Sequence, residues 1–294
     1  LPKYKLQNGN AGVWRRILKR FILLFLLGMV VQGNLLALDA ERIYIYSNTL
    51  QAIAVGYLLT VPMVLYLKPK WWLAVITALL VIYSVPMHIV GDWSPQGNFA
   101  CIVDKIILGR FHDGSSIAQD GSVIFAQWYD YTWIWSSLTF CCTVALGSFA
   151  GHLTKSGGSD RTATAKRLFA MAAAMLATGV LTGEFQPIIK RVWSASMVLY
   201  SAGWCYLLLA VSYWWIDLKG HRKGWDWLLY YGCNAITAYL LGEIINFRCI
   251  ASSLLHGTEQ YIGGWYPVLL TACNSIILFF ILRALYKARL FLKV

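Results

Sequence analysis

The chain has 294 residues, of which 59% are hydrophobic and 13% are charged, and its formal charge at neutral pH is +12. A soluble domain carries about 25% charged residues, so the polar residues of this chain are too few to cover a water-facing surface. The composition therefore excludes an ordinary soluble enzyme, a disordered chain and a small secreted module held by disulfides. It favours an all-α, polytopic membrane protein.

Eight stretches are long and apolar enough to cross a bilayer as helices, for which about 20 mostly apolar residues are needed. In chain order they are 21–38, 50–67, 71–90, 134–153, 168–181, 197–216, 227–247 and 266–285. None shows the alternation of polar and apolar residues that is typical of membrane β-strands. The sequence therefore predicts a transmembrane helical bundle of about eight crossings, forming a single integral membrane domain over residues 1–294.

Lys and Arg are unevenly distributed among the segments that connect these helices. If the N-terminus lies in the cytoplasm and each helix changes the side, 19 of the 25 Lys and Arg residues fall on the cytoplasmic side. This is the bias expected of membrane proteins, so both termini are predicted to be cytoplasmic. The positive charge is thus explained by topology. The lipid bilayer is the expected partner, and no nucleic-acid partner is expected.

One outer segment, residues 91–130, is unusually long, and loops of this length commonly carry function. Its middle, Cys101 to Leu108, is predicted to form a short helix on the membrane. Asp104 and Asp130 place two carboxylates near the outer mouth of the bundle. His112 is the one ring in this loop that could act as a base near neutral pH. The alternative interpretation is a solvated loop with local salt bridges.

Other polar residues lie where crossings begin on the outer side. Asn48 and Gln51 share one helix face, either as polar lining or as a helix cap with an interhelical hydrogen bond. Lys190 and Arg191 are adjacent cations that could pair with one of the loop carboxylates or bind an anionic group of a substrate. Each of these pairs is therefore a candidate for function with a structural alternative.

Small residues and cysteines inside the helices are predicted to be structural. Asn234, within the seventh crossing, is expected to bond a neighbouring helix. Two glycine pairs repeat at the spacing of helix-packing faces, Gly147 with Gly151 and Gly179 with Gly183. Such faces permit a homodimer without requiring one. Cys101 and Cys249 both fall on the outer side and could pair. No His or Cys cluster has metal-ligand spacing, so no metal is expected.

Five short segments follow one another in an informative order. They are L-Q-A-I-A at 50–54, I-V-D-K at 102–105 with His112 after it, Asp130 before a glycine-containing helix, P-I-I-K-R-V-W-S-A-S at 187–196, and Asp217 before G-C-N-A at 232–235. This ordered set resembles the heparan-α-glucosaminide N-acetyltransferase family and its bacterial relatives, which are membrane-bound acyltransferases. The chain departs from the family pattern at Ala52, which replaces Arg, and at 131–133, which replace Pro-Glu-Gly.

The resemblance implies transfer of an acetyl group from cytoplasmic acetyl-CoA to an amino sugar or glycan on the outer side. It implies catalytic or proton-handling roles for Asp104, Asp130 and Lys190. Acceptor binding is expected from polar residues at the outer mouth, namely Asn48, Gln51, His112, Trp193, Ser196 and Asn234. The anionic CoA is expected to be attracted by basic residues of an inner loop, namely Lys155, Arg161 and Arg167.

In the family, two further crossings precede the point at which this sequence begins, and the catalytic histidine lies between them. We therefore expect an N-terminally truncated chain without that residue, and we expect activity only from a protein that carries it. A transporter or flippase for a small sugar, and a non-catalytic relative, are the alternative functions. Compact loops favour a bacterial inner membrane over a lysosomal membrane.

Overall fold

The computed structural model describes residues 9–37, 42–156 and 160–292. Most of these residues are helical, and several of the helices are long and apolar enough to span a membrane, which confirms the predicted all-α bundle. The chain divides into two compact units, residues 1–220 (unit 1) and 221–294 (unit 2).

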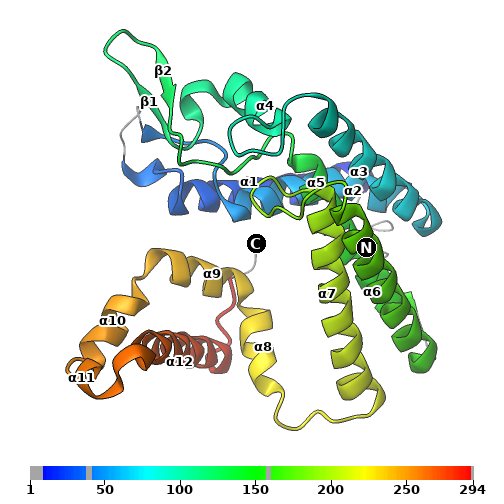
Figure 1. Cartoon of the computed structure of the whole chain (residues 1–294). Helices are drawn as coiled ribbons and strands as arrows, with labels where there is room; N and C mark the ends of the chain where they lie inside the picture. Colours follow the sequence, from blue (N-terminus) through cyan, green and yellow to red (C-terminus); the bar gives the residue numbers. More distant parts are fainter. Residues whose placement is uncertain (1–8, 38–41, 157–159, 293–294) are drawn as a thin grey trace. The chain divides into compact units, whose positions relative to one another are not determined.

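Unit 1 is built on long helices that pack in pairs (Figure 1). They are α1 (Gly9–Val31), α2 (Thr49–Tyr66), α3 (Trp72–Ile89), α5 (Ser137–Ser156), α6 (Arg161–Gly183) and α7 (Ala195–Ser212), with a π-helical turn at Tyr213–Leu218 that continues α7. α1 packs on α2, α5 packs on α2 and α3, and α6 packs along α7. Facing positions such as Leu168 and Val198 are fully buried, whereas Val81 and Val85 of α3 are exposed. Exposed apolar faces of this kind are suited to lipid.

Among the described residues, six helices, or seven if one bent pair counts as a single span, are long and apolar enough to cross a membrane, where the sequence predicts eight crossings. Two predicted crossings account for the difference. α1 ends at Val31 and carries four basic residues, Arg15, Arg16, Lys19 and Arg20, in its first half. The seventh predicted crossing is broken, because its helix is interrupted at Asn234 and again before Phe247, where the two flanking helices bend by 70°.

Glycines allow the closest helix contacts of unit 1. A Cβ atom added at Gly179 of α6 would lie 2.6 Å from the backbone nitrogen of Tyr200 in α7. A Cβ atom at Gly56 of α2 would lie 2.9 Å from the carbonyl oxygen of Phe140 in α5. Gly147 and Gly151 of α5, by contrast, have no atom of unit 1 within 4 Å of such a Cβ. Of the two predicted packing faces, only the one at Gly179 is used inside unit 1.

The long loop between α3 and α5 is more ordered than the sequence predicts. The expected short helix is present as α4 (Phe99–Leu108), which begins at the side-chain cap of Asn98. It is followed by the strands β1 (Ser115–Ile117) and β2 (Val123–Phe125), which pair antiparallel with Ser115 opposite Phe125. The hairpin projects from the rest of unit 1 (Figure 1). Strands of three residues are too short to give a periodic sequence signal.

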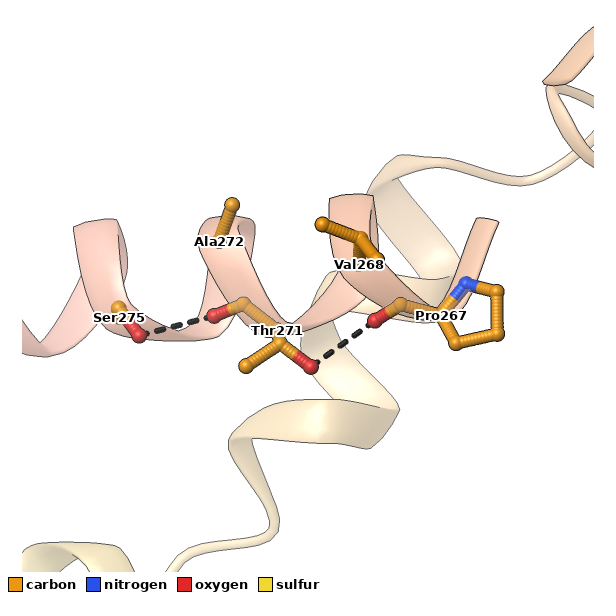
Figure 2. A pocket seen from close by; sticks show the side chains of 5 residues that line it. All are labelled: Pro267, Val268, Thr271, Ala272 and Ser275. Atoms are coloured by element: carbon orange, nitrogen blue, oxygen red, sulfur yellow. Dashed lines mark hydrogen bonds between the residues drawn. The ribbon is translucent and has the colours of Figure 1, made fainter. Parts of the chain in front are cut away.

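Unit 2 contains a long helix, α12 (Tyr266–Lys287), which contacts α8 (Asp226–Cys233), α9 (Ala235–Ile244) and α10 (Phe247–Leu254). A single short turn, α11 (Glu259–Ile262), precedes α12. A shallow depression on α12 is lined by Pro267, Val268, Thr271, Ala272 and Ser275 (Figure 2). Its two hydroxyls donate to backbone carbonyls one turn earlier, both at 2.9 Å, so they are used within the helix.

Candidate functional site

Polar residues of unit 1 gather where three connecting segments meet at one end of the helices. We call this region the loop layer and define it as residues 32–37, 42–48, 91–136 and 184–194. Within the layer, Thr132 N donates to Arg191 O at 3.2 Å. Two side chains of α3 also bond the segment 184–194: Tyr83 Oη donates to Val192 O at 2.6 Å and Ser84 Oγ to Gln186 Oε1 at 3.0 Å. The ends of α3, α5, α6 and α7 are therefore held together here.

Asp104, on α4, is fully buried and holds the start of α5. Its two carboxylate oxygens accept the backbone N–H groups of Trp133 at 2.6 Å and Ile134 at 2.9 Å. Burial raises the pKa of Asp104 to about 7, while the backbone hydrogen bonds act in the opposite direction. Both oxygens accept backbone N–H groups and none of the side chain is exposed. Asp104 therefore has a structural role, which is to hold the segment before α5 against α4.

Asp130 and Arg191 form an ion pair at the surface of the loop layer. The sequence leaves open which carboxylate pairs with the adjacent cations, and the structure places Arg191 on Asp130. Lys190 is exposed, and within the described ranges no ion pair joins it to Asp104 or Asp130. Lys190 is thus a cation of this region whose side chain is open to solvent and is not paired with either of these two carboxylates.

Replacing Arg191 with alanine should lower the stability of the protein only slightly. The Arg191 side chain is 55% exposed, and ion pairs in such positions contribute under about 1 kcal/mol. We expect the melting temperature in detergent to change by no more than a few degrees. A large decrease would show that the pair with Asp130 is needed to hold 184–194 in place.

Asn48 and Gln51 form a capping box at the start of α2. The Asn48 side chain accepts the N–H of Leu50 at 2.8 Å, and Gln51 Oε1 accepts the N–H groups of Ser47 and Asn48. Gln51 Nε2 donates to Ile45 O at 2.6 Å, so the amide of Gln51 is used on both sides. Both residues are buried. Asn48 and Gln51 therefore form a helix cap, which is the structural alternative to polar lining that the sequence leaves open for this pair.

The cap of α2 continues into a chain of hydrogen bonds through the long loop. Asn48 Nδ2 donates to Gln32 Oε1 at 3.2 Å, and Gln32 Nε2 donates to Asp113 Oδ2 at 3.4 Å. Asp113 also accepts a hydrogen bond from the Tyr129 hydroxyl. Tyr129 in turn accepts the indole N–H of Trp133 at 2.8 Å. Because Trp133 also donates its backbone N–H to Asp104, this chain of hydrogen bonds connects the cap of α2 with Asp113 and with Asp104.

His112 is buried beside this chain, with only 3% of its surface exposed. Its ring makes edge-on contacts with Phe125 and Tyr129, with centroids 5.6 and 5.2 Å away. Neither ring nitrogen has a hydrogen-bond partner among the described residues. Burial lowers the pKa of His112 and raises that of the adjacent Asp113. His112 is therefore neutral near pH 7 and retains one donor and one acceptor for a ligand.

Trp193 and Ser196 are used to hold the segment before α7. Trp193 has a left-handed backbone with φ of 51°, and its indole N–H donates to Thr143 Oγ1 at 3.0 Å. Ser196 Oγ donates to Pro187 O at 3.1 Å, and its neighbour Ser194 caps α7 by accepting the N–H of Met197. Ser196 is fully buried. These contacts give 187–196 a fixed shape.

The residues expected to attract CoA lie at the opposite end of the same helices. Lys155 is in the last turn of α5, and Arg161 and Arg167 lie in the first two turns of α6. All three are exposed. Arg161 Nη1 donates to the carbonyl of Asp217 in the π-helical turn at 2.8 Å. A helix of 20 residues is about 30 Å long, so these cations are far from the loop layer.

Asn234 belongs to unit 2, where it separates α8 from α9. It is 2% exposed, and neither atom of its amide group has a partner among the described residues. The expected hydrogen bond to a neighbouring helix is thus not made within the described part of unit 2. Cys101 is buried in α4 and Cys249 is exposed on α10, and both thiols are free. No group of three or more His, Cys, Asp or Glu in the described ranges could hold a metal ion.

Three residues of this site were missed by sequence reasoning, namely Gln32, Asp113 and Tyr129. Asp113 was passed over although it directly follows the candidate His112, and two acid–base groups side by side are a usable signal. The sequence pattern does not indicate a role for Gln32 or Tyr129. Gln32 bonds Asp113, which lies 81 residues further along the chain, and Tyr129 bonds the indole of Trp133, four residues away. Only the folded chain brings these partners together.

The apolar helices and this polar layer define an integral membrane protein with a structured polar end. Residues 3–101 match a family model described as heparan-alpha-glucosaminide N-acetyltransferase, catalytic. Over this part, about a third of its length, the chain is similar to the heparan-α-glucosaminide N-acetyltransferase family, and together with the apolar helices the match indicates a membrane acyltransferase. The matched range contains Asn48 and Gln51, whereas the other predicted site residues follow it. No curated protein matches the chain.

Proposed function

We propose that this protein transfers an acetyl group from acetyl-CoA to the amine of an amino sugar or glycan across a membrane. The observation that carries the proposal is the family match over 3–101, which includes α1, α2 and α3. The distribution of charge supports the sidedness, with the donor on the cytoplasmic side and the acceptor at the loop layer. The short connections outside the long loop favour the bacterial inner membrane.

The donor and acceptor ends have different chemistry in this proposal. Lys155, Arg161 and Arg167 provide positive charge for the phosphate groups of CoA. At the loop layer, the acceptor amine must lose a proton before it attacks the thioester carbonyl, and the oxyanion that forms must be stabilised. Asp130 is a candidate proton acceptor, and Lys190 is a candidate cation for the oxyanion.

The remaining predicted residues would shape the acceptor site. Asp104 would act as a positioning residue through its hold on the start of α5. Polar groups in the loop layer and in the first turns of α2 and α7 would meet the hydroxyls of the acceptor, namely Asn48, Gln51, His112, Trp193 and Ser196. Since the two ends of α5 are about 30 Å apart, the acyl end of the donor must penetrate towards the loop layer.

Transfer of labelled acetyl groups tests this function directly. We expect vesicles that contain the full-length protein, with the histidine expected upstream, to convert glucosamine to its N-acetyl derivative when radiolabelled acetyl-CoA is supplied. Lys190→Gln should reduce the rate by about 10²-fold, as does loss of a single oxyanion donor in other enzymes. Lys166→Gln, an exposed lysine on α6, should leave the rate unchanged and serves as the matched control.

Two outcomes would overturn the proposal. Recovery of unmodified sugar inside the vesicles would indicate a transporter or flippase. No transfer and no uptake with well-folded protein would indicate a non-catalytic relative. If transfer occurs but Lys190→Gln and Lys166→Gln behave alike, the role assigned to Lys190 is wrong while the reaction stands.

A further inference from the structure

The aspartates of the loop layer differ in their burial and in how fully their carboxylate oxygens are bound by other groups of the protein. Asp104 is fully buried with both oxygens on backbone N–H groups, and Asp130 is paired with Arg191. Asp92 and Asp120 are exposed and bind the serine two residues after them within a turn. Asp113 differs from Asp92, Asp120 and Asp130 because it is 91% buried and its hydrogen bonds come from neutral groups. It differs from Asp104 because one of its bonds, from the exposed Gln32, is long at 3.4 Å.

Asp113 has no cationic partner among the residues that the structure describes. Its hydrogen-bond donors are the amide of Gln32, the hydroxyl of Tyr129 and the backbone N–H of Gly114. A buried carboxylate without a counter-charge is unfavourable in its ionised form, and a positive group beside it restores that form. The place is therefore suited to a ligand that brings a positive charge.

His112 provides a second and independent indication of a ligand at this place. It precedes Asp113 directly and is 97% buried, yet both of its ring nitrogens are without a partner in the described ranges. A buried polar group that lacks a hydrogen bond costs about 1–3 kcal/mol. The buried hydroxyl of Ser47, next to Asn48 at the other end of the Gln32 bridge, is also without a partner there. A polar ligand would satisfy such groups.

The bond from Gln32 connects the buried Asp113 to the solvent-exposed surface. Its side chain belongs to an exposed residue just after α1, whereas the groups that it bridges, on Asn48 and Asp113, are buried. The bond from Gln32 Nε2 to Asp113 Oδ2 is 3.4 Å long, beyond the usual range for such bonds. A charged amino group that took the place of this amide would form a shorter, charge-assisted bond.

We propose that Asp113 binds the positively charged amino group of the acceptor, that His112 bonds a neighbouring hydroxyl of the same molecule, and that Gln32 is the positioning residue between them. This inference rests on the proposed function, because it takes the acceptor to be an amino sugar. It assigns the amine to Asp113, a residue outside the set expected from the sequence. Asp130 and Lys190 then remain available for the chemical step.

Binding without donor tests the inference separately from catalysis. We would titrate the purified protein in detergent with glucosamine and with glucose, which lacks the amino group, by calorimetry and without acetyl-CoA. We expect the wild type to prefer glucosamine, and Asp113→Asn to weaken glucosamine binding at least tenfold while glucose binding stays the same. Asp120→Asn, in the same loop, is the matched control and should keep the preference.

A second variant covers the case in which Asp113→Asn does not fold. Gln32→Lys alters an exposed residue and places an ammonium group beside Asp113, so it should also remove the preference for glucosamine. A wild type without this preference, or a folded Asp113→Asn or Gln32→Lys protein that keeps it, would overturn the inference. Asp113-dependent binding in a protein that transfers no acetyl would instead contradict the proposed function alone.

Discussion

Replacing Asp104 with alanine should remove most of the folded protein. The change leaves the buried N–H groups of Trp133 and Ile134 without an acceptor, and each such loss costs about 1–3 kcal/mol. The connection between α4 and the start of α5 is lost at the same time. Total stabilities are only about 5–15 kcal/mol, so the effect is a large fraction of the whole. Recovery of monodisperse protein in detergent and its melting temperature measure it.

Asp120→Ala is the matched control for this experiment. Asp120 lies in the turn of the β-hairpin, is exposed and bonds only Ser122 among the described residues, so its loss should leave the melting temperature nearly unchanged. If Asp104→Ala gives a normal yield and a normal melting temperature, the structural role assigned to Asp104 is wrong. Loss of acetyl transfer in such a stable variant would then support a direct role in the chemistry.

Alanine at Gly179 and alanine at Gly147 should have opposite effects on stability. At Gly179 the new Cβ would lie 2.6 Å from the backbone nitrogen of Tyr200, so α6 and α7 would have to move apart. Overpacking of this kind typically costs about 1–3 kcal/mol. At Gly147 the new Cβ has no atom of unit 1 within 4 Å, and Ala is favoured over Gly inside a helix by about 1 kcal/mol.

Melting temperatures of the two variants, measured in the same detergent, decide this prediction. We expect Gly179→Ala to melt well below the wild type and Gly147→Ala to melt at the same temperature or slightly above it. Equal decreases would mean that Gly147 also lies in a close contact, and equal stability would mean that α6 and α7 tolerate separation. Gly203→Ala, where the Cβ would lie 2.8 Å from Leu176 N, should behave like Gly179→Ala.

The helices were largely predictable, because their apolar stretches exceed the length needed to cross a bilayer. The predicted segment 50–67 corresponds to α2 (Thr49–Tyr66), and 266–285 corresponds to α12 (Tyr266–Lys287). The prediction was wrong where hydropathy alone gives no sign of a break. Residues 227–247 are mostly apolar, yet the backbone is interrupted at Asn234 and bends after Ile244.

The candidate site was predictable in its region and less so in its members. The sequence indicates the long loop and the segment before α7 as candidate regions, since they flank the ends of apolar helices, and in the structure polar groups of both lie in the loop layer. The roles expected of individual residues remain predictions. What the structure adds is their surroundings: Asp104 is enclosed, Gln51 is part of a cap, and Lys190 is open to solvent.

The sequence by itself determined that this protein is a helical membrane protein, where most of its long helices lie and which family it resembles. These properties depend on composition, on the length of apolar stretches and on local motifs, all of which are read along the chain. Only the tertiary structure decided which glycine pair packs helices, which carboxylate accepts Arg191, and that Gln32 bridges Asn48 to Asp113. These contacts join residues far apart in the chain, and burial sets which polar groups are left to bind a ligand.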